Sequence, residues 1–64
     1  MQPLPNPDHE QFAQDIARAI NAEDGERYRQ LMDSRDNPLK RPDITRGDIK
    51  AIHARVHWLA DNDA

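Results

Sequence analysis

His53 and His57 lie four residues apart, and Asp61 follows after four more. On a helix this spacing places the three side chains along one flank, as in many zinc or nickel sites. The chain has no His-Glu-x-x-His pattern to supply a catalytic base beside such a metal. Histidine is also common at the edge of an apolar helix face. We therefore expect the two histidines to be boundary residues and expect no metal site.

Other kinds of catalysis have few suitable residues in this chain. There is no cysteine, Ser34 is the only serine, and Gly25 and Gly47 stand alone, so no glycine-rich loop could hold a phosphate. The carboxylates are numerous but fall on polar helix faces, and a chain of 64 residues has little volume for a pocket. We expect no enzyme activity, no cofactor and no small-molecule substrate.

Protein binding has a better candidate in Trp58, the only tryptophan. Tryptophan is enriched at the energetic centres of interfaces. Trp58 lies about half a turn from the apolar stripe of its predicted helix, beside Ala51, Ala54 and Arg55. The stripe itself has the 3-4-3 spacing of a core-facing helix and consists of Ile49, Ile52, Val56 and Leu59. Because one apolar face is enough for folding, we predict that Trp58, Ala51, Ala54 and Arg55 form a partner-binding face.

A second set of residues could contact nucleic acid. Lys40, Arg41, Arg46 and Lys50 lie in the basic part of the chain and could line a phosphate backbone. The order of turns argues against a helix-turn-helix motif, because the helix after the tight turn begins with acidic residues that would repel phosphate. DNA or RNA binding through the basic segment 35–55 is therefore the less favoured alternative.

The first half of the chain is expected to form a helical hairpin behind an extended arm. Residues 1–6 contain alternating prolines, and Leu4 is the one arm residue able to dock. Asn6 and Pro7 are typical of a helix start, and the first helix is predicted over about 7–21. Its apolar face comprises Phe12, Ala13, Ile16, Ala17 and Ile20. A second helix over about 24–35 would use Tyr28, Leu31 and Met32, with Tyr28 at the core edge. One continuous helix over 7–35 is the alternative.

The second half begins with a connection over 36–44, where two prolines prevent a continuous helix. Thr45 is the expected N-cap of a third helix over about 45–60, with Asp48 as its capping-box partner. Ile44 and Ile49 occupy the positions of a hydrophobic staple. We predict one all-α domain over 1–64, a small two- or three-helix antiparallel hairpin or bundle.

Composition narrows the functional class further. The net charge is −3, with 33% charged and 36% hydrophobic residues, and no apolar run approaches the length of a membrane span. The N-terminal segment lacks the basic and apolar regions of a signal peptide, so we expect a cytoplasmic protein. A core of this size rarely supplies more than about 3–5 kcal/mol. We therefore expect a non-enzymatic regulator, adaptor or inhibitor, of a kind often encoded by phages and plasmids, that binds another protein or a second copy of itself.

Overall fold

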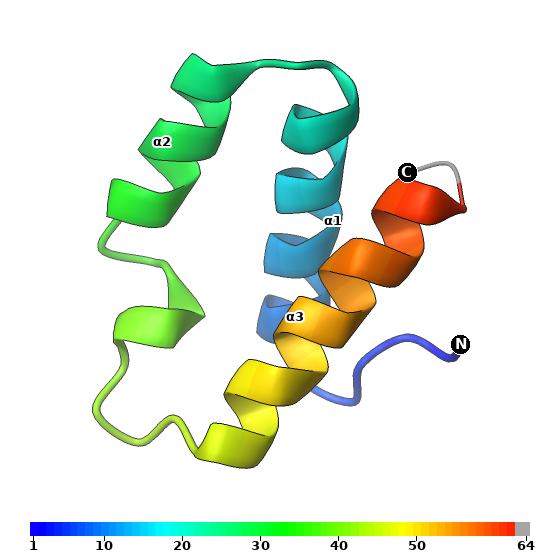
Figure 1. The fold of residues 1–64 in the computed structure, drawn as a ribbon. Coiled ribbons are helices and arrows are strands. Elements are labelled where there is room, and N and C mark those ends of the chain that lie inside the picture. The colour runs from blue at the N-terminus through cyan, green and yellow to red at the C-terminus, as the bar shows by residue number, and fades with distance from the viewer. Residues whose placement is uncertain (63–64) are drawn as a thin grey trace.

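The computed structural model describes residues 1–62 of the chain, so the last two residues of the expected domain lie outside the described part. Its elements are α1 (Pro7–Asn21), α2 (Gly25–Asp33), the single 3₁₀ turn η1 (Pro38–Lys40) and α3 (Arg46–Asp61). Helix α2 runs antiparallel to α1, and α3 returns along the other side of α1 (Figure 1). No strand occurs within residues 1–62. The all-α bundle predicted from the sequence is confirmed.

Helix α1 begins where the sequence favours a start. The side chain of Asn6 accepts a hydrogen bond from the Asp8 backbone N–H at 2.9 Å, and Pro7 occupies the first helical position. Proline has no N–H to lose there, and its fixed φ suits the first turn. The acidic side chains of Asp8 and Glu10 also lie at the positive end of the helix dipole.

Helix α1 ends in a Schellman motif, which separates it from α2. Glu23 has a positive φ of 54°, and the Asp24 N–H donates to the Ala19 carbonyl at 2.9 Å. The Asp24 side chain then caps α2 by accepting from the Arg27 N–H. The alternative of one continuous helix over 7–35 is therefore wrong. A left-handed residue that is not glycine costs roughly 1–2 kcal/mol, and the paired carbonyls of the motif offset part of that cost.

The connection from α2 to α3 is held by Asn37, which is 2% exposed. Its side-chain amide donates to the Met32 carbonyl at 2.8 Å, and its side-chain oxygen accepts from the Leu39 N–H at 2.9 Å. Pro38 follows as a fully buried residue at the start of η1. The sequence predicts the extended backbone of Asn37 before proline, but not this buried anchor.

Helix α3 starts with the predicted capping box. The Thr45 hydroxyl accepts from the Asp48 N–H at 3.0 Å, and the Asp48 carboxylate accepts from the Thr45 N–H at 3.3 Å. Two of the backbone donors that a helix start leaves unpaired are satisfied in this way.

Replacing Thr45 with alanine should lower the free energy of unfolding by about 1 kcal/mol, since the N-cap acceptor is lost. Urea unfolding followed by circular dichroism measures this change. Thr45→Ser keeps the hydroxyl and is the matched control, expected to lie close to wild type. Equal losses in both variants would contradict the capping explanation.

The core forms where α1 and α3 cross. Phe12, Ala13 and Ile16 of α1 pack with Ile52 and Val56 of α3, all of them buried. Half-buried apolar residues surround this cluster and come from the arm, α2, the connection and α3: Leu4, Leu31, Met32, Leu39, Ile44 and Leu59. Leu4 therefore docks on the core as the sequence suggests.

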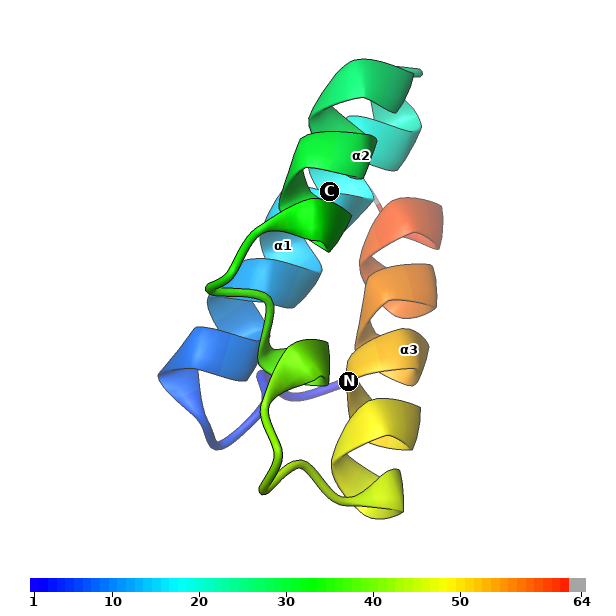
Figure 2. The ribbon, with the colours of Figure 1, turned by 90° about the vertical axis from the view of Figure 1, so that its left-hand side faces the viewer.

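Ile20, expected on the apolar face of the first helix, is 43% exposed and so less buried than predicted. Tyr28, expected at the core edge, is 40% exposed. Both α2 and α3 pack mainly on α1 rather than on one another, so the side of α1 between them is incompletely covered. Figure 2 shows α2 in front of α1, with α3 running alongside them on the right. No helix among residues 1–62 is long and apolar enough to cross a membrane.

Candidate binding surfaces

A buried ion pair between Glu10 and Arg55 links α1 to α3 at the base of the N-terminal arm. The Arg55 guanidinium donates from Nε to Oε1 and from Nη2 to Oε2 of Glu10, both at 3.0 Å. The sequence pattern placed Arg55 on an open partner-binding face. In the structure Arg55 is only 5% exposed, so it lies in the interior instead. Its position on the helix borders the core stripe, and Glu10 compensates its charge there.

Glu10 also ties the arm to the bundle. One carboxylate oxygen accepts from the Leu4 N–H at 2.9 Å and the other from the Gln14 side chain at 2.8 Å. Arg55 Nη1 donates to the Met1 carbonyl at 3.2 Å, so the same ion pair holds the arm at two points, Met1 and Leu4. In Figure 1 the arm lies against α3 on the side away from α2.

The hydrogen bonds from Arg55 hold the pKa of Glu10 well below its usual range. They outweigh the opposing effect of burial, the Leu4 and Gln14 hydrogen bonds add to them, and the pKa falls from 4.5 to about 2. Since the folded pKa is depressed, the stabilisation is complete above pH 4.5 and is lost as the pH falls toward 2. Every pKa unit corresponds to about 1.4 kcal/mol, so the pair accounts for about 3 kcal/mol of pH-dependent stability.

Acid titration should therefore reveal the pair. We expect the free energy of unfolding of the wild-type chain to fall by about 3 kcal/mol more than that of the double variant Glu10→Leu/Arg55→Met between neutral pH and about pH 2. Urea melts at a series of pH values measure both curves. The double variant removes both charges, so it leaves no stranded Arg55 in the interior and lacks this titration. Parallel curves for the two proteins would show that Glu10 does not titrate with a depressed pKa.

Trp58 lies beside the buried arginine and remains partly open to solvent. Its ring is 36% exposed, and the Arg55 Cζ atom lies 5.0 Å from the ring centroid, a cation–π distance. Of the neighbours expected in the same face, Ala54 is exposed and Ala51 is half-buried. The surface made by Ala51, Ala54 and Trp58 is called the tryptophan face below.

A second apolar surface opens between α2 and α3, with α1 as its floor. This apolar groove has a volume of about 150 Å³. It includes the exposed Ile20 and Tyr28 and the half-buried Met32 and Leu39. Its full lining comprises Phe12, Ile16, Ile20, Tyr28, Met32, Leu39, Ile52, His53, Val56 and His57. All of these side chains are apolar or aromatic except the two histidines, and none carries a carboxylate.

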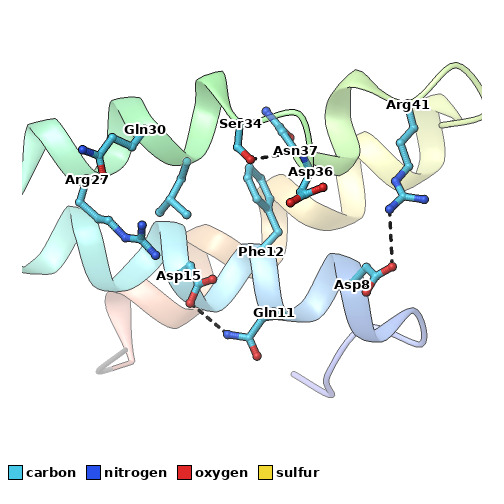
Figure 3. Close-up of a pocket in the computed structure, with 11 residues that line it drawn as sticks. Asp8, Gln11, Phe12, Asp15, Arg27, Gln30, Ser34, Asp36, Asn37 and Arg41 are labelled. Atoms are coloured by element: carbon cyan, nitrogen blue, oxygen red, sulfur yellow. Dashed lines mark hydrogen bonds and ion pairs between the residues drawn. The ribbon is translucent and has the colours of Figure 1, made fainter.

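The opposite side of α2 forms a polar groove of about 560 Å³ against α1 and the connection (Figure 3). Three aspartates and two arginines line it, and two of them, Asp8 and Arg41, approach to 3.7 Å. Ser34, also in the lining, accepts a hydrogen bond from the Asp36 N–H. Among the described residues that line this groove, none is a histidine or cysteine that could serve as base or nucleophile. The charges in the groove are largely balanced.

The four basic residues considered for nucleic acid do not act alike. Lys40 donates to the Asp33 carbonyl at 2.9 Å, and Arg41 pairs with Asp8. Arg46 and Lys50 are exposed on α3 and make no ion pair with residues 1–62. Only two of the four are thus left unengaged by other groups in the described part of the chain.

The histidine flank of α3 faces the apolar groove rather than a cluster of acidic ligands. His53 and His57 both line the groove and are exposed. Within residues 1–62 no group of three histidine, cysteine or carboxylate side chains is arranged to hold a metal ion. The structure places these histidines at the boundary between apolar and solvent-exposed surface.

Sequence reasoning missed two features of these surfaces. It placed Ile20 in the core, although the same apolar side chain forms part of an open groove. It also treated Glu10 as a solvent-exposed carboxylate at the helix start. The i, i+4 spacing of Glu10 and Gln14 was a usable signal, because a glutamine one turn away can donate to a carboxylate.

Comparisons with models of known protein families, with characterised proteins and with solved structures find no match to this chain.

Proposed function

We propose that this chain is a non-enzymatic protein-binding module, acting as a small regulator, adaptor or inhibitor. The observation that carries the proposal is the apolar groove between α2 and α3. Two large side chains in this groove, Ile20 and Tyr28, are 43% and 40% exposed. Exposed apolar surface rimmed by polar residues is typical of interaction sites.

The polar groove supports enzymatic activity less well. It holds opposing charges but no unit of nucleophile and base. The basic segment likewise supports nucleic-acid binding weakly, because Lys40 and Arg41 are engaged with other groups of the chain. Protein binding remains the function for which the surface chemistry is best suited.

Site-specific photocrosslinking in cells of the source organism tests the proposal. The photoreactive amino acid p-benzoylphenylalanine replaces Tyr28 in the groove or, as a control, Gln30 on the other flank of α2. We expect a discrete protein adduct from position 28 and not from position 30. The partner protein identified in the adduct should then bind the purified chain and should bind the Tyr28→Ser variant more weakly. Equal labelling from both positions, or none from position 28, would contradict binding through the groove.

The tryptophan face is a second surface of the same module, and Trp58→Ala tests its role. We expect this substitution to destabilise the fold less than truncation of a core residue, because Trp58 is 36% exposed and lies outside the buried cluster formed by Phe12, Ala13, Ile16, Ile52 and Val56. If Trp58 anchors an interface, association should weaken by about 2 kcal/mol or more. Circular dichroism melts and calorimetric titration with the crosslinked partner measure the two effects.

Leu59→Ala is the contrasting variant for this face, because Leu59 packs against the core cluster and lines neither groove. It should lower stability and change affinity only through the fraction of folded chain. Unfolding of the isolated chain by Trp58→Ala, with unchanged affinity per folded molecule, would show that Trp58 serves the fold alone.

A further inference from the structure

Helix α3 carries two basic residues and two histidines on one side, along the rim of the apolar groove. Arg46, Lys50, His53 and His57 are spaced by four, three and four residues, so they lie on one side of the helix. All four are exposed, and the last two line the groove directly. The carboxylate that follows on this side is Asp61, one turn beyond His57.

The other wall of the groove, on α2, has mixed charge. Tyr28 and Met32 of α2 line the groove, whereas Arg27, Gln30 and Leu31 line the polar groove on the opposite flank. Arg29 lies one position after Tyr28 and three before Met32, which places it on the outer edge of the apolar groove. It is exposed and makes no ion pair within residues 1–62. Arg29 shares this outer side of α2 with Glu26, three positions before it, and Asp33, four positions after it. The excess of positive charge beside the apolar floor therefore lies on α3, at Arg46 and Lys50.

We propose that the apolar groove binds an amphipathic helix of a partner protein whose polar flank is acidic. This inference rests on the proposed function and adds the chemistry of the partner. A volume of about 150 Å³ is close to that of a cavity that admits benzene, so one large apolar side chain of the partner fits into it. Helices present such anchors at i, i+3 and i+4 to grooves between other helices.

The charges beside the apolar groove indicate which class of partner fits it. An acidic flank that faces α3 meets Arg46 and Lys50, whereas the mixed charge of α2 gives no comparable attraction, so the charges favour encounter in one orientation. A nucleic acid would use the same cations but would leave Ile20 and Tyr28 uncovered. Strand addition requires an open sheet edge, and residues 1–62 contain no strand. An acidic amphipathic helix is the occupant that satisfies both the apolar floor and the basic residues of α3.

Two fluorescent helical peptides of about 16 residues serve as probes. They share leucines at alternating spacings of three and four, and one carries glutamates on its polar flank where the other carries lysines. Fluorescence anisotropy with the full chain should show at least about tenfold tighter binding of the glutamate peptide at low salt, and this preference should shrink as salt is added.

Charge reversal then locates the preference. Lys50→Glu should remove most of it, because an exposed rim cation becomes an anion. Arg27→Glu makes the same charge change on the opposite flank of α2 and should leave it intact. Tyr28→Ser should weaken both peptides, since it removes apolar contact from the groove. Circular dichroism confirms that each variant remains helical.

The outcomes separate this inference from the proposed function. Equal binding of both peptides that is lost in Tyr28→Ser would overturn the acidic partner and keep protein binding. Absence of glutamate-peptide binding also overturns the inference. The proposed function is tested independently, by the crosslinking at position 28. A Lys50-dependent complex with duplex DNA in place of the peptide would overturn it in favour of nucleic acid. A dimer abolished by Tyr28→Ser would assign the groove to a second copy.

Discussion

Arg55→Ala is expected to leave most of the chain unfolded in dilute buffer. Removing the arginine strands the Glu10 carboxylate in a site where it is only 9% exposed. Breaking one partner out of a buried ion pair typically costs about 3–5 kcal/mol. A core of this size rarely supplies more than about the same amount, so the folded population should fall sharply.

Circular dichroism and urea unfolding measure this loss of stability, and two further variants identify its cause. Arg46→Ala removes an exposed arginine from the same helix and should change stability by no more than about 0.5 kcal/mol. The double variant Glu10→Leu/Arg55→Met replaces the pair with apolar side chains and should recover much of the stability. A double variant as unstable as Arg55→Ala would show that the cost does not come from the stranded charge.

The double variant also reports on the N-terminal arm. Because Glu10 accepts the Leu4 N–H and Arg55 donates to the Met1 carbonyl, removing both groups should release the arm. Hydrogen exchange at Leu4 should then accelerate while the core amides stay protected. This separation would distinguish the role of the pair in holding the arm from its role in packing α1 on α3.

Helix starts could be predicted from the sequence because their causes are local. The Asn6 cap and the Thr45–Asp48 capping box each depend on residues no more than three positions apart, and both form as expected. The core stripe of α3 was also visible in its spacing, and Ile52 and Val56 are buried. In these cases the residues that decide the structure lie within one or two turns of one another.

The burial of Arg55 could not be predicted in the same way. Its partner Glu10 is 45 residues away, and helical spacing places Arg55 between the core stripe and the tryptophan face. A cation at such an edge either points to solvent or enters the interior beside a carboxylate. Only the packing of α3 on α1 decides between these outcomes.

The apolar groove depends on a still less local cause. Its width is set by how α2 and α3 sit on α1, and the connection between them is anchored by the buried Asn37 and Pro38. The apolar face of α1 predicted which side chains face inward, but not that Ile20 would remain uncovered. The candidate binding residues are exposed because α2 and α3 together cover α1 incompletely. The apolar pattern of a single helix does not predict this.

Ile52→Ala should be the most damaging substitution of an apolar residue in α3. Ile52 is 0% exposed and is the largest fully buried apolar side chain, packed in the central cluster with Phe12, Ile16 and Val56. Truncation of such an isoleucine loses its transfer free energy and leaves a cavity, at a cost of about 2–5 kcal/mol. The folded population should thus fall as it does for Arg55→Ala, but without a change in acid sensitivity, because Glu10 keeps its partner.

Ile20→Ala is the matched control, since it removes the same atoms from a side chain that is 43% exposed at the groove. It should cost less than about 1 kcal/mol in stability, because little apolar surface returns to water and no enclosed cavity forms. The same variant should weaken binding of the glutamate peptide. Ile44→Val truncates a residue that packs against the core outside the groove lining, so this variant should bind the peptide normally per folded molecule. Urea melts with parallel anisotropy titrations compare the three. A neutral Ile52→Ala, or a loss as large in Ile20→Ala, would show that the α1–α3 crossing is not where the chain gains its stability.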